Sequence, residues 1–485
     1  MKKWMDKYFL YIPMLLVEIY LLFTVALYQF GPLNWKTENE VMFWTFLLLY
    51  HAAFILGYVL SIRKIKLRAP QWSVSRLSPR AFRGVMWAIL AVCLVSACIE
   101  YKNLTHADSY IPYDLPKNFW NGLINPAKQY YSKGAAEGYT SNKLVTLGSA
   151  LFSFIYVSLI PLLVVEWKRI ALPQKILCFA VILFKVVVYV SVGTNKGIFD
   201  TMFGFVGILL ILLLLNLYSG SDAHIDKKTF LKVSAFALFL VVFSFSYFTF
   251  NISTRVKSPV DYAMKVAGHQ TETKPQETKP ASKPQDEASG KDNPGEAQGE
   301  KAPEPTKPVT DPAQAPKPDS FLKKMYYSVT NYLTQGYYGM SLSLDEEFTT
   351  TYGIGNSQFL MSNFKSLFGI DVQDRTYQHK ITDRWHESGK WHSFYSYFAN
   401  DISFYGVVVL MFLIGLFYGC ICKDVILNNS LLGKLLLPLF ILMFMYMPAN
   451  NQVFTAMATC TAFLELSFLG LLSKINWKKG SKHGK

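Results

Sequence analysis

Cysteine is scarce in this chain of 485 residues, and none of the six cysteines lies in a long polar stretch. They are Cys93, Cys98, Cys178, Cys420, Cys422 and Cys460, and all lie within or beside apolar runs. A disulfide framework, or a zinc site built from CxxC pairs, needs cysteines in folded polar segments. The sequence argues against both.

Acidic residues are also few, because 33 Asp and Glu stand against 48 Lys and Arg for a net charge of +15. Half of the chain (51%) is hydrophobic, and several apolar runs reach the roughly 20 residues needed to cross about 30 Å of hydrocarbon. The basic residues collect in short loops between these runs, which is the positive-inside pattern of membrane proteins. The sequence therefore predicts an all-α polytopic membrane protein without a nucleic-acid partner.

The N-terminus lacks the features of a cleaved signal peptide. Met1–Lys7 contains three lysines and leads into the apolar run Tyr8–Phe30, which is too long for a signal-peptide core and has no small-residue cleavage pattern after it. Further along, Arg63–Arg83 holds seven Arg or Lys and no acid. We expect this basic segment and both termini to be cytoplasmic.

Alternation from that basic segment predicts about ten membrane helices. The expected spans are Tyr8–Phe30, Val41–Ile62, Gly84–Ile99, Leu144–Val165, Ile176–Val192, Thr201–Tyr218, Leu231–Phe250, Ile402–Cys420, Leu435–Met447 and Val453–Leu472. The ninth is short and ends in Pro448, so a re-entrant or broken helix is the alternative there. Residues 1–250 then hold seven helices, 251–401 form a large external loop between helices 7 and 8, and 402–485 hold three helices and a basic tail.

The external loop consists of two different kinds of sequence. Residues 268–320 carry ten of the 22 prolines, repeat Glu-Thr-Lys-Pro, and have no aromatic or large aliphatic residue except Val309. Such a segment buries too little apolar surface to fold, so it predicts a disordered tether. Residues 321–401 are instead rich in aromatic residues and hold three histidines and two arginines. We expect this part to fold and to form a site.

Four ionisable residues fall inside the predicted spans: Glu18, His51, Lys185 and Glu465. Each costs a few kcal/mol or more in hydrocarbon and should find a partner in the bundle interior. We expect Lys185 to pair with Glu465 or Glu18, as a structural ion pair or, alternatively, as part of a transport pathway. His51 is expected to be a hydrogen-bonded packing residue.

The candidate site lies in the stretch YQHKITDRWHESGKWHSF, where three histidines, His379, His386 and His392, alternate with Trp385 and Trp391. Histidine titrates near neutrality and serves as a base, while tryptophan faces stack on sugar rings. The pattern is typical of a sugar site, with a zinc site or an amphipathic loop on the membrane as the alternatives. Acidic alternatives for the base are Asp371, Asp374, Asp383, Glu387 and Asp401.

Five segments support a resemblance to a known family. They are FGPLNW (Phe30–Trp35), INPAKQYYSKGAAEGYTSN (Ile124–Asn142), GTNKGIFD (Gly193–Asp200), YLTQGYYGMSLSL (Tyr332–Leu344) and the run Phe394–Gly419. In this order they resemble the Wzy-type polysaccharide polymerases, also called oligosaccharide repeat unit polymerases, which are similar to O-antigen ligases. Where that family often has Arg between the glycines of the 193–197 turn, this chain has Asn195 and Lys196.

The resemblance implies transfer of a growing glycan from a polyprenyl (undecaprenyl) diphosphate carrier onto the next lipid-linked repeat unit. It places the reaction on the outer face of the bacterial cytoplasmic membrane, among membrane lipids, with a chain-length regulator protein as a partner and no cofactor. Such an enzyme must stabilise a departing diphosphate and deprotonate an acceptor hydroxyl. The external loops contain no DxD, which argues against a metal-dependent nucleotide-sugar transferase, and we expect no metal site.

The diphosphate requires cations near the outer ends of the helices. Arginine suits this role because its planar group donates two hydrogen bonds at once and keeps its charge. Arg255, a few residues beyond a predicted helix end, is the first candidate, with an interfacial lipid anchor as the alternative. Arg375, Arg384 and Lys196 are further candidates, with solvated loop charges as the alternative for the two arginines.

Two other functions remain open from the sequence. An O-antigen ligase-like transferase differs from a polymerase mainly in its acceptor. A flippase of lipid-linked oligosaccharides belongs to a different class, and it should have short loops and inverted repeats around a central cavity. The apolar runs show no repeat of one another, and the chain has one dominant polar stretch, which favours the enzyme.

Overall fold

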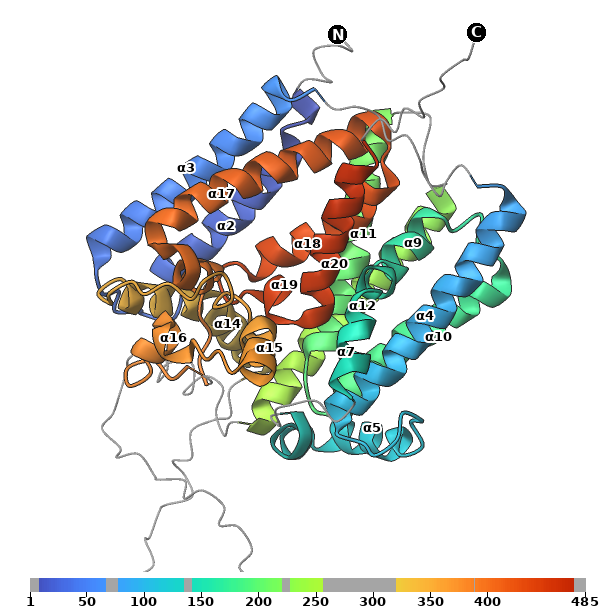
Figure 1. The fold of residues 1–485 in the computed structure, drawn as a ribbon, viewed down its shortest axis with the longest axis horizontal. Coiled ribbons are helices and arrows are strands. Elements are labelled where there is room, and N and C mark those ends of the chain that lie inside the picture. Colours follow the sequence, from blue (N-terminus) through green and yellow to red (C-terminus); the bar gives the residue numbers. More distant parts are fainter. Residues whose placement is uncertain are drawn as a thin grey trace, which may run out of the picture.

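The computed structural model describes residues 8–66, 77–134, 142–219, 227–255, 320–387 and 389–474, and this part is helical without strands (Figure 1). Within it, seven helices are long and apolar enough to cross a membrane: α2 (Ile12–Phe30), α3 (Glu40–Lys64), α4 (Pro79–Thr105), α10 (Leu172–Ser191), α11 (Lys196–Ser219), α12 (Lys227–Arg255) and α17 (Phe394–Asn428). Two apolar helices of 16 residues each follow, α18 (Leu431–Tyr446) and α20 (Met457–Leu472). The prediction of an all-α polytopic membrane protein is confirmed, and the count of ten spans stays a prediction.

Serine residues mark the beginning of several of these helices. Ser78, Ser393 and Ser430 each accept a hydrogen bond from a backbone N–H in the first turn of α4, α17 and α18. A hydroxyl at this position satisfies one of the backbone donors that a helix leaves open at its N-terminus. Apolar runs therefore set the interior of each helix, and the serines set where it begins.

The expected span Leu144–Val165 is not one helix. The structure divides it into α7 (Lys143–Ala150), α8 (Ser153–Val157) and α9 (Leu159–Val165). At the first break the N–H groups of Leu151 and Phe152 donate to the carbonyl groups three residues earlier in the chain. The N–H of Phe154 donates to the Glu465 carboxylate at 3.2 Å. Irregular backbone at this depth is tolerated where protein or a polar cavity satisfies it. The last span is broken in the same way, into α19 (Gln452–Thr455) and α20.

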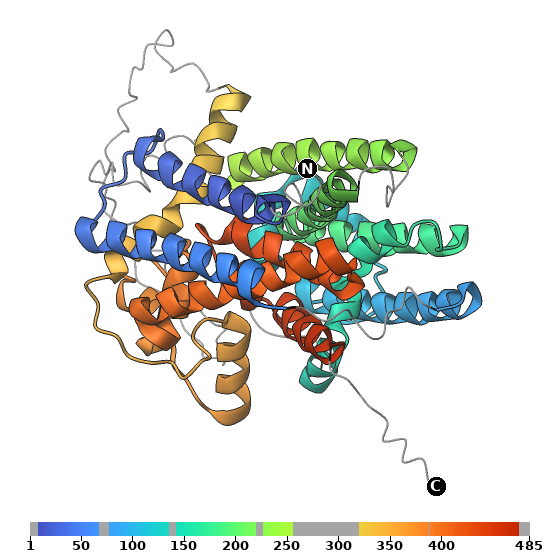
Figure 2. The ribbon, with the colours of Figure 1, turned by 90° about the horizontal axis from the view of Figure 1, so that it is seen from above.

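Helices α3 and α17 lie side by side along much of their length (Figures 1 and 2). A Cβ atom on Gly57 would lie 2.0 Å from the carbonyl oxygen of Phe412, and one on Gly415 would lie 2.1 Å from that of Phe54. Glycine at these two positions thus allows the two backbones to touch. Tyr50 reinforces the contact by donating a hydrogen bond to the carbonyl of Phe404 at 3.0 Å.

The four intramembrane ionisable residues all have partners, although not those expected. Glu18 binds His51 at 2.7 Å, which confirms His51 as a hydrogen-bonded packing residue. Glu465 accepts from Ser153 at 3.1 Å. Lys185 places its ammonium 5.1 Å from the centre of the Tyr156 ring. The expected ion pairs of Lys185 with Glu465 or Glu18 were therefore wrong.

Short helices and connecting segments gather at one end of the bundle, which we call the loop end (Figures 1 and 2). They are α5 (Leu115–Ile124), α6 (Pro126–Gln129), the π-helix η2 (Tyr130–Gly134), α14 (Phe321–Ser343), α15 (Gln358–Phe368), the 3-10 turn η4 (Gln373–Arg375) and α16 (Tyr377–Lys380). Helix α14 packs against α2, α12 and α17. Of the predicted tether 268–320, only Ser320, the N-cap of α14, lies within the described residues.

Candidate functional site

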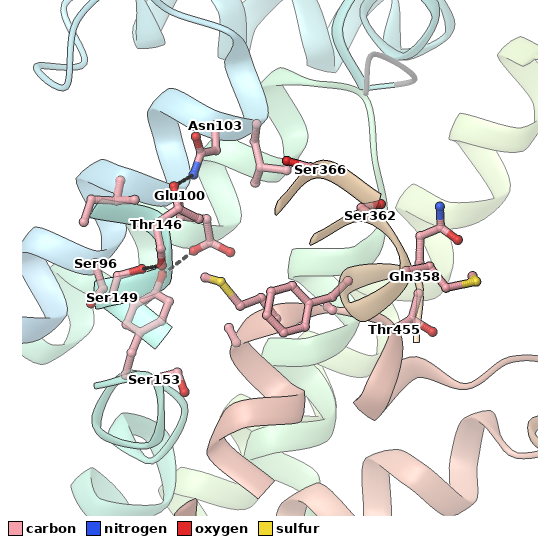
Figure 3. A pocket seen from close by; sticks show the side chains of 18 of the residues that line it. Ser96, Glu100, Asn103, Thr146, Ser149, Ser153, Gln358, Ser362, Ser366 and Thr455 are labelled. Carbon is pink, nitrogen blue, oxygen red and sulfur yellow. Dashed lines mark hydrogen bonds between the residues drawn. The ribbon is translucent and has the colours of Figure 1, made fainter. Parts of the chain in front are cut away.

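A cavity of about 810 Å³ lies at the loop end, between α4, α7, α8, α15 and the 455–458 segment (Figure 3). Its volume falls within the range of about 300–1,000 Å³ that ligand pockets in proteins usually occupy. Most polar groups on its walls are hydroxyls and amides. They come from Ser96, Asn103, Thr146, Ser149, Ser153, Gln358, Ser362, Ser366, Gln373 and Thr455.

Two facing helical stretches supply one side of this cavity. Ser96, Glu100 and Asn103 follow one another on α4 at intervals of four and three residues, so they share one face of the helix. Thr146, Ser149 and Ser153 repeat the pattern on α7 and α8, and Asn103 donates a hydrogen bond to Thr146 at 3.3 Å. The broken α7–α8 backbone thus borders a polar space.

Glu100 is the carboxylate on the α4 wall, and two tyrosines hold it. Tyr156 donates to one carboxylate oxygen and Tyr189 to the other, each at 2.7 Å. Because an ionised carboxylate has about four acceptor positions, each oxygen keeps acceptor capacity beyond its tyrosine. The carboxylate is fixed in orientation and lines the cavity, as a base or a ligand for sugar hydroxyls must be (Figure 3).

Helix α15 forms the opposite wall and carries the charges of the cavity rim. Ser357 caps its N-terminus, and Gly369, at φ +70°, ends it. Lys365 forms an ion pair with Asp371 at 2.6 Å, and this hydrogen bond lowers the pKa of the Asp371 carboxyl. Lys143, at the start of α7, contacts the Ser366 hydroxyl. Two lysines therefore lie beside the mouth of the cavity.

The three histidines expected to form the site do not converge. His392 is fully buried, neither of its ring nitrogens has a hydrogen-bond partner, and burial lowers its pKa to about 3. In this structure a substrate does not reach it. His379 is partly exposed and lies between Glu387 at 3.2 Å and Asp374 at 3.5 Å. His386 is exposed, and none of the three lines the cavity.

The two tryptophans expected to stack on sugar belong to an aromatic cluster. Trp385 is buried and donates to the carbonyl of Trp391 at 3.0 Å. Its ring packs edge to face against Tyr338, at 5.0 Å between centroids. Trp391 is half-buried and packs against Tyr332 at 5.4 Å. The face of Trp385 is thus used in packing, and neither tryptophan lines the cavity.

Three of the predicted cations are bound by groups of the protein itself. Arg384 pairs with Glu38 at 2.9 Å and Glu346 at 3.0 Å, which joins the α2–α3 connection to the end of α14. Lys196 pairs with Asp200 at 2.6 Å. Arg375 lies over the ring of Tyr352, at 5.2 Å from its centre.

Arg255 lies at the end of α12, where it joins two segments that carried the family resemblance. Its guanidinium donates to Asn251 at 2.9 Å and to the carbonyl of Gly193 at 2.5 Å, and it lies 3.7 Å from the centre of the Tyr130 ring. Gly193 has φ +69°, and a Cβ there would be 2.1 Å from the Pro126 carbonyl oxygen, so only glycine fits. A role for Arg255 toward phosphate stays a prediction.

Among the acidic alternatives for the base, Asp401 is already occupied. Its carboxylate accepts from the N–H groups of Gly353, Gly355 and Asn356 at 2.9 to 3.1 Å, and from the Asn356 side chain at 2.7 Å. These bonds use the acceptor positions of a carboxylate, so Asp401 organises a loop. Of the five alternatives, Asp371 is the one that lines the cavity, at its rim.

Sequence reasoning missed Glu100, which follows directly after the predicted span Gly84–Ile99. The signal was present as the polar face of Ser96, Glu100 and Asn103 at the end of an apolar run. Within the described residues, no group of three His, Cys, Asp or Glu side chains is placed to hold a metal ion, so the three-histidine zinc alternative finds no ligand set. No family model, curated protein or solved structure matches this chain.

Proposed function

We propose that this protein is a membrane glycosyltransferase that polymerises polyprenyl-diphosphate-linked oligosaccharide repeat units on the outer face of the bacterial cytoplasmic membrane. The observation that supports it is the cavity of about 810 Å³ at the loop end, with its hydroxyl and amide walls and the fixed carboxylate of Glu100. Sugars are bound by such convergent polar groups together with aromatic side chains, here Tyr156 and Tyr189.

The charges of the cavity suggest how a lipid-linked sugar lies in it. A diphosphate needs cations, and Lys143 and Lys365 lie at the rim beside Ser366. The sugar then enters the polar interior and meets Glu100. This orientation keeps two negative groups apart. The diphosphate stays at the mouth of the cavity, and the Glu100 carboxylate lies inside it.

Glu100 takes the role of the base in this proposal. The acceptor hydroxyl loses its proton to the Glu100 carboxylate as its oxygen forms the new glycosidic bond. The bond between the anomeric carbon and the diphosphate oxygen breaks, and the diphosphate leaves with the electron pair. Tyr156 and Tyr189 hold the carboxylate so that its remaining acceptor positions face the hydroxyl.

Substitution of Glu100 tests the proposal. Glu100→Gln keeps the shape of the side chain but cannot take a proton, so we expect polymer formation to fall by about 10²-fold or more while single repeat units accumulate. The control is Glu347→Gln, which removes a carboxylate at an exposed position outside the cavity lining. Polymer length on gels, from cells with equal membrane levels of each variant, is the measurement.

A normal polymer ladder from Glu100→Gln removes Glu100 from the mechanism. If the wild-type protein transfers single units to any acceptor without forming a ladder, the proposed function changes from a polymerase to a ligase-like transferase. Translocation of lipid-linked units without any new glycosidic bond replaces it with a flippase.

A further inference from the structure

The described lining of the cavity contains three charged residues, Glu100, Asp371 and Lys365. Asp371 and Lys365 form an ion pair at 2.6 Å at the rim of the cavity, and both side chains are well exposed, at 47% and 60%. Glu100 is half-buried, and its partners Tyr156 and Tyr189 are buried and uncharged donors. Among the described lining residues, the interior of the cavity therefore carries one acidic side chain and no basic one.

The nearby cation Lys185 does not line this cavity. Its ammonium lies 5.1 Å from the centre of the Tyr156 ring. It lines a different cavity, of about 70 Å³, together with Asp200. A ligand in contact with Glu100 is thus not in contact with Lys185.

The hydrogen bonds of Glu100 also define what the ligand must present. Tyr156 and Tyr189 occupy one acceptor position on each carboxylate oxygen, so each oxygen keeps acceptor capacity for a ligand. Two neighbouring donors on one sugar ring match two neighbouring acceptors. Vicinal hydroxyls, or a hydroxyl beside an amine, satisfy this geometry.

Building on the function proposed above, we propose that the sugar bound against Glu100 is a neutral or amino-bearing hexose with two vicinal donors, and not a uronic acid. A uronate would bring a second carboxylate beside Glu100, where the described lining offers no cation, because Lys365 lies at the rim. Repulsion between the two carboxylates makes such a site selective against uronic acids. The hydroxyl and amide groups of the walls bind neutral hexoses and amino-bearing hexoses alike.

Binding measurements on the purified full chain in detergent micelles test this inference without requiring turnover. The probes are trimers of N-acetylglucosamine, of glucosamine and of galacturonic acid, which are neutral, cationic and acidic at pH 7. We expect the first two to bind about tenfold or more tighter than the acidic trimer, as measured by saturation-transfer NMR titration.

Glu100→Gln is the matched variant, because it keeps the shape of the wall and removes the charge. We expect it to bind the acidic trimer as tightly as the neutral one, whereas Glu347→Gln, at an exposed position outside the cavity lining, keeps the wild-type selectivity. Equal or tighter binding of the acidic trimer by the wild type contradicts the inference, as does selectivity that survives in Glu100→Gln. Absence of binding by all three trimers contradicts it as well.

The outcomes for the inference and for the proposed function are separable. If the protein forms polymer but binds the acidic trimer best, the proposed sugar selectivity is wrong and the proposed polymerase function stands. A chain that binds neutral sugars selectively but never forms polymer keeps a sugar site and loses the polymerase function.

Discussion

At the scale of single residues, Arg255 lies outside the cavity lining and is held by groups of the protein itself. Two of its donor groups bind Asn251 and the carbonyl of Gly193, and its flat face covers Tyr130. The guanidinium thus connects the end of α12 to the turn that follows α10. The planar fork that makes these bonds is also what a diphosphate would use.

Substitutions at Arg255 separate a role toward diphosphate from lipid anchoring. Arg255→Lys keeps the charge but loses the fork, and Arg255→Ala loses both, so we expect polymer formation to fall in that order at constant protein level. Lysine reaches lipid headgroups nearly as well as arginine. Arg255→Lys with wild-type activity therefore indicates a lipid anchor. Thermal melting of both variants, measured in parallel, reports how much the contacts with Asn251 and Gly193 stabilise the fold.

The histidines show where prediction from sequence ends at this scale. His379, His386 and His392 occur within one aromatic-rich stretch, and the sequence gives each the same imidazole group to act as a base. Their burial differs completely, because His392 packs beside Gly339 in the core and His386 stays exposed. Burial depends on tertiary contacts with α14, which lies some 50 residues earlier and has no pattern that points to His392.

At the scale of elements, α17 consists of two parts with different structural roles. Its Ser403 has φ +63° and ψ 166°, a conformation rarely adopted by residues other than glycine, and it divides the helix. The part before Ser403 carries Asp401, which organises the 350–356 loop, and the part after it crosses the bundle beside α3. The expected span began at Ile402, one residue from this division.

The loop held by Asp401 yields a prediction about stability. Asp401→Asn removes the charge and replaces one acceptor oxygen by a donor, so one or two of the three backbone N–H groups lose their partner. We expect it to lower the free energy of unfolding by about 3 kcal/mol, measured by chemical denaturation in micelles. Asp383→Asn, at an exposed position in the same part of the chain, should leave it unchanged. Equal stability of the two variants contradicts the organising role of Asp401.

Hydrophobic runs predicted most of the long helices within a few residues of their ends, because burial in lipid or protein requires a continuous apolar stretch. They did not predict the breaks at Leu151 and Ser158, since these depend on partners from elsewhere, such as Glu465 on α20. The cavity was missed for the same reason. Its walls combine α4 with α15, which are far apart in sequence and not linked by any pattern.

At the scale of the whole molecule, the distribution of charge predicts sidedness. The basic segment Arg63–Arg83 should face the cytoplasm and the loop end should face outward. In a background without native cysteines, we expect a membrane-impermeant thiol reagent applied from outside to label Asp383→Cys and not Lys66→Cys, both at exposed positions. Labelling in the reverse pattern inverts the topology and places the cavity on the cytoplasmic side.

The cavity forms in stages during synthesis, because its walls emerge from the ribosome at different times. At about 5–20 residues per second, roughly 20 to 70 s pass between the emergence of Ser96 and that of Ala458, the first and last lining residues in the sequence. During this interval the carboxylate of Glu100 enters the membrane without the α15 wall. Its two tyrosine partners come from α8 and α10, so they arrive early. The newly synthesised chain can therefore form both hydrogen bonds to the half-buried Glu100 long before the other walls of the cavity are made.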